Sequence, residues 1–353
     1  MEKKDLKSLR KKIDSIDDQL LDLIIERSSV VEKIGNLKKN HKKIVDKKRE
    51  AEVISRLLKF HKGNFSKDSI IRIWREIFHT STNIQLKNNN ILKAKRGVED
   101  IKLYKGGRAK IKGIKKIIKL SSNESPFGPS KKAKKAYEKS SSKLSRYPEL
   151  TAESLQIEIA KKNNLNADQI ICGTGSDEIL IFALLTFCAP GDEVIHAKHG
   201  FEMYPIVTKY AGAETILASE EDYKISIKSV ISNITDATKI ILIANPNNPT
   251  GTYLNKNEVL ELRKKLRSDI LLVVDDAYFE YIKDPEYASG IDLFSKSKNV
   301  IVTRTFSKIY GLAGLRIGWG YGPKKLIQKL YEIKPPFNVR RPALFAATKA
   351  VLD

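Results

Sequence analysis

The sequence predicts a multidomain protein with an all-α N-terminal domain and an α/β domain whose parallel sheet carries helices on both faces. Apolar residues recur at spacings of three, four and seven over residues 6–37, the period of a long amphipathic helix. Over residues 168–320, short apolar runs alternate with helical stretches, which is typical of βαβ units. Several of these runs end in polar or glycine-rich motifs, and ligands of open α/β sheets bind at such carboxyl ends.

Composition narrows the function classes. A chain of 353 residues with 41% hydrophobic residues fits two or three domains. A formal charge of +23 is typical of proteins that bind nucleic acid. Here the lysines are spread along the whole length without aromatic interleaving or a recognition-helix pattern, so nucleic acid is not an expected partner. No apolar run is long enough for a membrane span or a signal peptide, which predicts a cytoplasmic protein. Cys172 and Cys188 show no metal-ligand spacing and are expected to be buried.

Three helices are expected in the N-terminal domain. The first runs from about Lys4 to Lys38, the second ends at Gly63, and Ser66 or Asp68 caps the third. One very long helix cannot bury its whole apolar stripe against two shorter partners in the same chain. We therefore expect this domain to form a homodimer.

Basic residues on the first predicted helix indicate a site shared between two chains. Arg27 and Lys38 are eleven residues apart, so at about 100° per residue they share a face. Arg10 lies about 42 Å from Lys38 at about 1.5 Å per residue, too far for one small ligand to span. Two antiparallel copies of the helix would bring Arg10 and Lys38 to the same ligand.

Four segments within residues 5–85 carry a family resemblance: LRKKID, LIIERSSVVEKIGNLK, VDKKRE and FHTSTNIQ. Through them, residues 5–85 resemble the all-helical chorismate mutase family. By that resemblance, chorismate is the substrate and Arg10 reaches the partner's pocket. The rearrangement to prephenate requires no nucleophile and no proton transfer, so arginines clamp the carboxylates while Lys38 and Gln85 donate to the ether oxygen. The resemblance implies catalytic roles for Arg27, Lys38 and Gln85, and a substrate-binding set of Arg10, Arg27, Lys38, Asp46, Arg49, Glu50, Ser81 and Gln85.

A polar stretch without periodicity, LKNNNILKAK, separates the two parts of the chain. The expected domain limits are residues 1–86 for the helical domain, 87–97 for the linker and 98–353 for the α/β domain.

The motif TFSKIYGLAGLRIGWG, residues 305–320, places Lys308 between the apolar run 299–303 and a glycine-rich turn. A lysine at this edge can form a Schiff base with an aldehyde cofactor, and Arg316 has the fork geometry to bind a phosphate. In a chain with 65 Lys and Arg residues, however, a single lysine beside a turn is more often a surface residue. Other motifs are needed to assign Lys308 a function.

Two further motifs point to the same sheet edge. NPNNPTG, residues 245–251, and VVDDAY, residues 273–278, each end an apolar run. A pyridine cofactor requires a carboxylate at its ring nitrogen and donors at its phenolic oxygen, and Asp275, Asn248 and Tyr278 are of these types. Adjacent strand residues face opposite ways, so only one of the two aspartates can serve, and Asp275 is the expected one.

From about Val98 onward the chain resembles fold-type I pyridoxal-phosphate aminotransferases, specifically the histidinol-phosphate aminotransferase family. The resemblance implies pyridoxal 5'-phosphate as cofactor and Lys308, Asp275 and Tyr278 as catalytic residues. SSNESPFGPS, residues 121–130, matches the family's segment over the substrate and gives Asn123 as a substrate contact. Tyr147, in RYPE, would reach the cofactor phosphate of the opposite protomer. The implied cofactor contacts are Tyr147, Gly175, Ser176, Asp177, Phe201, Asn248, Asp275, Tyr278, Thr305, Ser307, Lys308 and Arg316.

Together these features predict a bifunctional enzyme of aromatic amino-acid biosynthesis whose partners are chorismate, an amino acid and a 2-oxo acid. The transaminase would act on histidinol phosphate, or on prephenate, phenylpyruvate or hydroxyphenylpyruvate. Another reaction of the same cofactor, amino-acid decarboxylation, and a truncated copy with only mutase activity are the alternatives. The family continues through a small domain that supplies an arginine for the substrate carboxylate, and this chain stops at Asp353, before that domain is complete.

Overall fold

The computed structural model describes residues 2–37, 46–85, 97–98, 101–104, 106–107, 112–113 and 117–353. The chain divides into two compact units, residues 1–94 and 95–353. The domain and linker limits given above stay a prediction.

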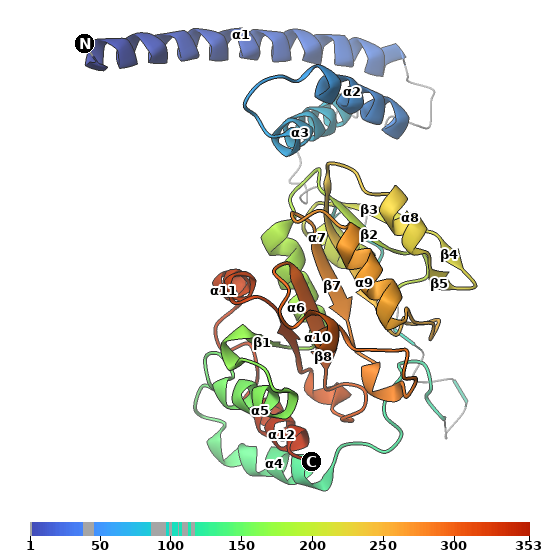
Figure 1. The fold of residues 1–353 in the computed structure, drawn as a ribbon. Coiled ribbons are helices and arrows are strands. Elements are labelled where there is room, and N and C mark those ends of the chain that lie inside the picture. The colour runs from blue at the N-terminus through green and yellow to red at the C-terminus, as the bar shows by residue number, and fades with distance from the viewer. Residues whose placement is uncertain are drawn as a thin grey trace. The chain divides into compact units, whose positions relative to one another are not determined.

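The described residues of the first unit form three helices, α1 (Glu2–Leu37), α2 (Lys47–Phe60) and α3 (Lys67–Gln85) (Figure 1). Ser66, one of the two predicted caps, begins α3: its hydroxyl accepts from the amide of Ser69 at 3.1 Å. Both α1 and α2 pack on α3, and this contact buries Val31, Ile54 and Phe78. Much of the apolar stripe of α1 stays outside it, since Leu9 and Leu23 are 60% and 61% exposed.

The second unit is built on a seven-stranded sheet of order β1-β9-β8-β7-β6-β2-β3 (Figure 1). Apolar runs predicted as strands form its centre, and their side chains are buried on both faces, as in other α/β proteins. The strands are β1 (Ile170–Gly173), β2 (Glu193–Ala197), β3 (Glu214–Ala218), β6 (Thr238–Ala244), β7 (Leu271–Asp275), β8 (Val300–Thr305) and β9 (Gly318–Tyr321). The predicted α/β class is confirmed.

One strand departs from the predicted parallel order. β9 runs antiparallel to both of its neighbours, β1 and β8. The connection from β8 to β9 contains only turns and the short 3-10 helix η5 (Ala313–Leu315), without the crossover helix that joins parallel neighbours. The sheet is therefore mixed. A separate hairpin pairs β4 (Glu220–Glu221) with β5 (Lys224–Ile225).

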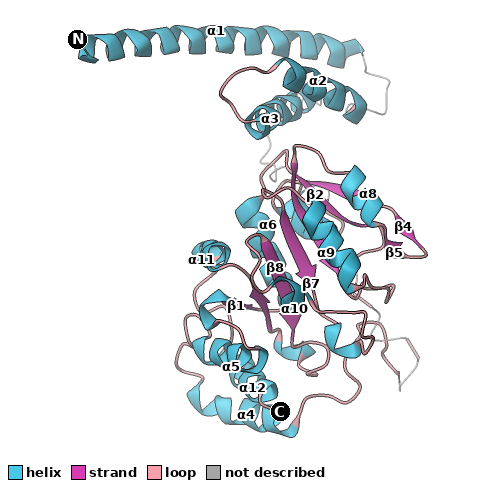
Figure 2. Cartoon of the chain, viewed as in Figure 1, coloured by secondary structure: helices cyan, strands magenta, loops and turns pink. Residues whose placement is uncertain are grey.

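Helices cover both faces of the seven-stranded sheet (Figure 2). One face packs against α6, α7 and α11, and the other against α5, α9, α10 and α12. The helices are α4 (Lys131–Lys139), α5 (Glu153–Asn163), α6 (Ser176–Phe187), α7 (Met203–Tyr210), α8 (Ile227–Ser232), α9 (Lys256–Lys265), α10 (Gly290–Phe294), α11 (Lys324–Ile333) and α12 (Arg341–Val351). Cys172 and Cys188 are buried and unbridged, as predicted.

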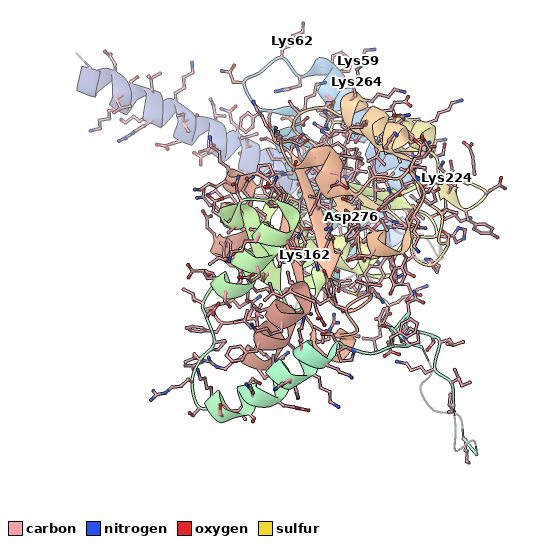
Figure 3. All side chains as sticks on the ribbon, turned by 60° about the horizontal axis from the view of Figure 1, so that its bottom comes forward. Lys59, Lys62, Lys162, Lys224, Lys264 and Asp276 are labelled. Carbon is pink, nitrogen blue, oxygen red and sulfur yellow. The ribbon has the colours of Figure 1, made fainter. Side chains whose placement is uncertain are left out.

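Lysine side chains lie around the periphery of each unit. Lys59 and Lys62 are exposed on the helical unit and Lys264 on the sheet unit, whereas Asp276 lies in the interior (Figure 3). Among the described residues, none of the helices has the length and apolar character that crossing a bilayer requires.

Candidate active sites

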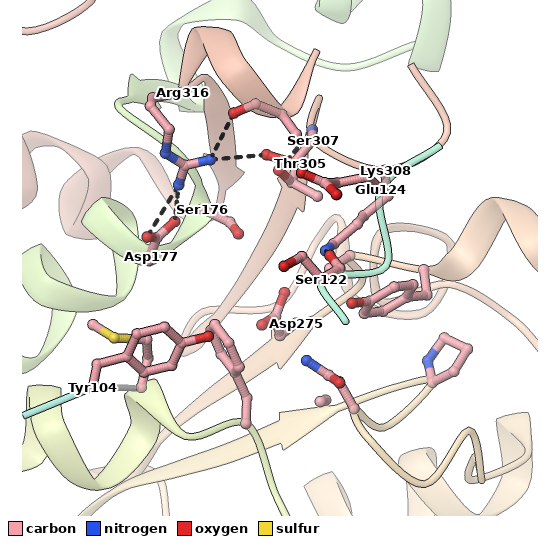
Figure 4. A pocket seen from close by; sticks show the side chains of 18 residues that line it. Tyr104, Ser122, Glu124, Ser176, Asp177, Asp275, Thr305, Ser307, Lys308 and Arg316 are labelled. Carbon is pink, nitrogen blue, oxygen red and sulfur yellow. Dashed lines mark hydrogen bonds and ion pairs between the residues drawn. The ribbon is translucent and has the colours of Figure 1, made fainter. Parts of the chain in front are cut away.

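The carboxyl ends of β6, β7 and β8 surround a pocket of about 400 Å³ (Figure 4). This size is within the range of small-molecule and cofactor sites. Most residues expected at the sheet edge line it: Ser176, Asp177, Phe201, Asn248, Asp275, Tyr278, Thr305, Ser307, Lys308 and Arg316. They come from segments far apart in the sequence, and parallel strands bring them together because their carboxyl ends meet at one edge.

Lys308 is half-buried in the pocket. Its Nζ donates to the carbonyl of Ser122 at 3.1 Å and lies 5.2 Å from the ring centroid of Tyr278. Asn123, which adopts a left-handed φ of 53°, donates from Nδ2 to the Tyr278 hydroxyl at 3.1 Å and to Asn248 Oδ1 at 3.5 Å. The segment over residues 121–130 therefore lies beside the lysine.

Asp275 and Asp276 have different surroundings, although both are buried. Asp275 lines the pocket and accepts from Thr303 Oγ1 at 2.9 Å and from the Tyr204 hydroxyl at 3.2 Å. Burial raises the pKa of Asp275 to about 6, and these two hydrogen bonds oppose the rise. Asp276 instead accepts from the amide of Gly290 at 2.8 Å and lies 3.8 Å from a guanidinium nitrogen of Arg304. Burial raises its pKa to about 8.

Near the start of α6, the pocket is lined by groups that are suited to bind a phosphate. Gly175 begins α6 with φ 101°, and no side chain caps the first amides of this helix. Arg316 donates to both carboxylate oxygens of Asp177, at 3.1 and 3.2 Å, and to the Ser307 hydroxyl at 3.1 Å (Figure 4). A Cβ on Gly318 would lie 2.3 Å from the amide nitrogen of Ser176, so this glycine permits the close approach of α6 to β9.

One predicted residue lies elsewhere in this chain. Tyr147 is 79% exposed, and its ring stacks on Phe337 with centroids 4.8 Å apart.

Some residues in and beneath the pocket were not predicted from the sequence. Tyr204 and Thr303 hold Asp275, while Tyr104, Ser122 and Glu124 line the wall. For Thr303 a signal existed, since alternate residues of a strand share a face and Thr305 was already assigned. Ser122 and Glu124 flank Asn123 in the motif at residues 121–130, so a signal existed for them as well, whereas Tyr104 and Tyr204 carried none.

In the helical unit, Arg27 and Ser81 link two helices. Arg27 Nη1 donates to Ser81 Oγ at 2.5 Å, and burial lowers the pKa of the arginine. One turn further along α3, Gln85 lies against Gly35 of α1, where a Cβ would come within 3.0 Å of its side chain. The buried Oε1 of Gln85 has no hydrogen-bond partner among the described residues. These groups form a polar cluster between α1 and α3.

The remaining residues of the predicted substrate set are more dispersed. Glu50 pairs with Arg75 at 3.3 Å, and both side chains are 15% exposed. Arg49 contacts Glu52 on the surface, and Asp46 caps α2 by accepting from the Arg49 amide at 2.9 Å. The list of predicted residues is completed by Arg10, which is exposed on α1, and by Lys38, which lies outside the described residues. Arg75 was not anticipated.

Comparison with known families follows the division into two units. The family Aminotransferase class I and II matches residues 115–353. The chain belongs to this family. Chorismate mutase type II matches residues 9–86, so the helical unit is a chorismate mutase type II domain. The protein therefore combines two enzyme domains in one chain.

Individual relatives point the same way for the aminotransferase domain. Histidinol-phosphate aminotransferase of Pelagibacter ubique is 49% identical over 253 residues, covering 72% of this chain and 70% of the relative. That of Dinoroseobacter shibae is 46% identical, covering 73% and 71%. The crystal structure of histidinol-phosphate aminotransferase from Sinorhizobium meliloti in complex with pyridoxal-5'-phosphate has a TM-score of 0.62 at 26% identity. The match covers 66% of this chain and 63% of that structure.

Proposed function

We propose that the chain is a bifunctional enzyme, with chorismate mutase activity in the helical domain and pyridoxal-phosphate-dependent transamination in the sheet domain. The convergence of Lys308, Asp275 and Arg316 on one pocket carries the second assignment. Similarity to histidinol-phosphate aminotransferases supports it.

The residues present fit pyridoxal phosphate. The pocket offers an amine, a buried carboxylate and, at its far end, an arginine beside the uncapped amides of α6. Gly318 lets the amides of α6 approach β9 at that end, because a Cβ there would collide with the Ser176 amide. When bound, the cofactor supplies an electron-withdrawing ring and an aldehyde that captures an amino group.

Each residue then has a distinct task. Lys308 would hold the cofactor through its Nζ and, once the amino donor has displaced that nitrogen, the freed amine would move a proton at the α-carbon of the donor. Asp275 would pair with the ring nitrogen and keep it protonated, while Asn248 and Tyr278 would hydrogen-bond the phenolic oxygen. Arg316, with Ser307 and the amides of Ser176 and Asp177, would bind the phosphate.

Absorption and labelling test the cofactor assignment. Purified protein incubated with pyridoxal phosphate should gain a visible absorption band that borohydride abolishes, leaving the reduced cofactor on Lys308. Peptide mass spectrometry locates the label. Attachment to any other lysine contradicts the assignment, and Lys308→Ala should take up no covalent label.

Two amino-acceptor classes are proposed for the transaminase. Similarity to relatives named for histidinol phosphate supports that substrate family, whereas fusion to a mutase supports aromatic 2-oxo acids or prephenate. Steady-state assays with glutamate and imidazole acetol phosphate, phenylpyruvate, hydroxyphenylpyruvate or prephenate distinguish them by kcat/KM. Release of carbon dioxide in place of a new amino acid would instead support the decarboxylase alternative.

For the mutase, the polar cluster at Arg27, Ser81 and Gln85 supports chorismate as the ligand. A guanidinium can clamp a carboxylate, and donors at the breaking ether bond stabilise its developing charge. Arg27→Ala should lower the rate of prephenate formation roughly a hundredfold or more. Arg56→Ala, which removes an exposed arginine of α2 outside the predicted set, serves as the control and should leave the rate unchanged.

A further inference from the structure

Tyr204 lies beneath the pocket and is not among the residues that line it. It is 1% exposed on α7, and its amide donates to the carbonyl of Phe201 at 2.9 Å in the turn that begins the helix. A buried tyrosine requires a partner for its hydroxyl. Here that partner is Asp275 Oδ2, at 3.2 Å.

The ring of Tyr204 makes a second set of contacts. Phe201, which lines the pocket, packs edge-on against it with centroids 5.7 Å apart. On another side the ring of His196 also lies 5.7 Å away. Burial lowers the pKa of His196, which leaves a neutral imidazole packed against the phenol. The side chain of Tyr204 thus contacts both Asp275 and Phe201, two residues that line the pocket.

We propose that Tyr204 is a positioning residue of the aminotransferase site. Its hydroxyl stabilises the carboxylate form of Asp275, and its ring supports the ring of Phe201 in the pocket wall. This inference rests on the proposed function, because both residues are assigned to the cofactor. Tyr204 itself does not line the pocket and would act through these two neighbours.

The charges around Asp275 make the effect of the hydroxyl measurable. Burial raises the pKa of Asp275, Asp177 on α6 raises it further, and the donors Thr303 and Tyr204 lower it. The other charged or titratable groups that line the pocket are Tyr104, Glu124, Tyr278, Lys308 and Arg316. Asp276 directly follows β7 and does not line the pocket. Removing one of two donors from a buried carboxylate therefore shifts its pKa upward.

Cofactor binding reports this shift. A ring-protonated cofactor pairs with the Asp275 carboxylate, so affinity falls as the pH drops below the pKa of Asp275 in the empty protein. Loss of the Tyr204 hydroxyl moves the midpoint of that fall to higher pH. A purely structural role would lower affinity to a similar degree at every pH.

The experiment measures the dissociation constant of pyridoxal phosphate for the full chain from about pH 5 to about pH 9. We expect Tyr204→Phe to bind roughly tenfold more weakly near neutral pH and to raise the acid midpoint by about one pH unit. Tyr210→Phe, which removes the other tyrosine hydroxyl of α7, should match the parent protein. In an Asp275→Asn background, Tyr204→Phe should produce no midpoint shift, since the titrating group is gone.

An unmoved midpoint in Tyr204→Phe overturns the proposal, even if affinity falls. Failure of the parent protein to bind the cofactor overturns the proposed function instead. The Tyr204 interaction is then decided by thermal unfolding of the cofactor-free chain. Because Asp275 binds its proton more tightly when folded, stability falls with rising pH up to its folded pKa, and Tyr204→Phe must extend that fall to higher pH.

Discussion

At the scale of single residues, two adjacent aspartates at the end of β7 have separate surroundings: Asp275 is the last residue of the strand and Asp276 directly follows it. Asp275 contacts hydroxyl groups and the pocket, while Asp276 contacts Arg304 and the amide of Gly290. Neutral donors hold the first without neutralising it, so it can pair with a cationic ligand. The second already faces a cation and stabilises the fold.

Substitution at each aspartate should separate these roles. Asp275→Ala should still allow borohydride labelling at Lys308 but lower transamination by orders of magnitude, since an unprotonated ring is a poor electron sink. Asp276→Ala should cost roughly 2–3 kcal/mol of stability, because Arg304 loses a buried partner, and should retain activity below its melting temperature. Denaturant unfolding and kcat measure the two effects. If Asp276→Ala abolished activity and Asp275→Ala did not, the catalytic aspartate would be Asp276.

Buried carboxyl groups predict how stability depends on pH. Burial raises the pKa of Asp275 to about 6, of Glu280 to about 7 and of Asp276 to about 8. Each group binds its proton more tightly in the folded state, so its contribution to stability is fully present below the unfolded pKa of about 4 and is lost as the pH rises towards 8. Glu280→Gln should flatten this fall in melting-temperature scans. An unchanged slope would mean that Glu280 does not titrate in this range.

At the scale of elements, the approach of α6 to β9 creates the proposed phosphate end of the pocket. Gly318→Ala places a Cβ 2.3 Å from the Ser176 amide and 2.6 Å from the Gly175 carbonyl carbon. The helix must shift, which should weaken cofactor binding at least tenfold and cost about 1–3 kcal/mol. Gly314→Ala is the matched control, because its Cβ meets no atom within 4 Å. Equal cofactor affinity in both variants would mean that α6 does not bind the phosphate.

At the scale of the whole molecule, the helical unit leaves an apolar stripe without a covering surface in the described part of its own chain. Leu9, Leu20 and Leu23 on α1 are all at least half exposed. An exposed apolar stripe of this kind favours association, and an antiparallel copy of α1 would also bring a second Arg10 towards Arg27. We therefore expect mutase sites shared between two chains.

Mixing two inactive variants tests this arrangement. Arg10→Ala and Arg27→Ala chains, unfolded together and refolded, should recover about a quarter of the parental mutase rate, since half of the random dimers carry one intact site of two. Each variant refolded alone sets the background. No recovery would mean that a single chain supplies both arginines to one site.

The sequence by itself determined both domains and most of the pocket. Periodicity gave α1, α2 and α3 because a helix repeats every 3.6 residues, and apolar runs gave the central strands because parallel strands are buried on both faces. Motifs at strand ends gave Lys308, Asp275 and Arg316, since parallel strands end at one edge. Each of these inferences depends on residues near one another in the chain.

Only the tertiary structure decided the contacts made across the chain. The reversed strand β9, the partner of Tyr204 and the pairing of Glu50 with Arg75 depend on which surfaces meet after folding. No local spacing records these contacts, because a hydroxyl or guanidinium can satisfy many partners and packing selects one. The sequence therefore specified the groups to which we assign the chemistry, and the fold selected the side chains that contact them.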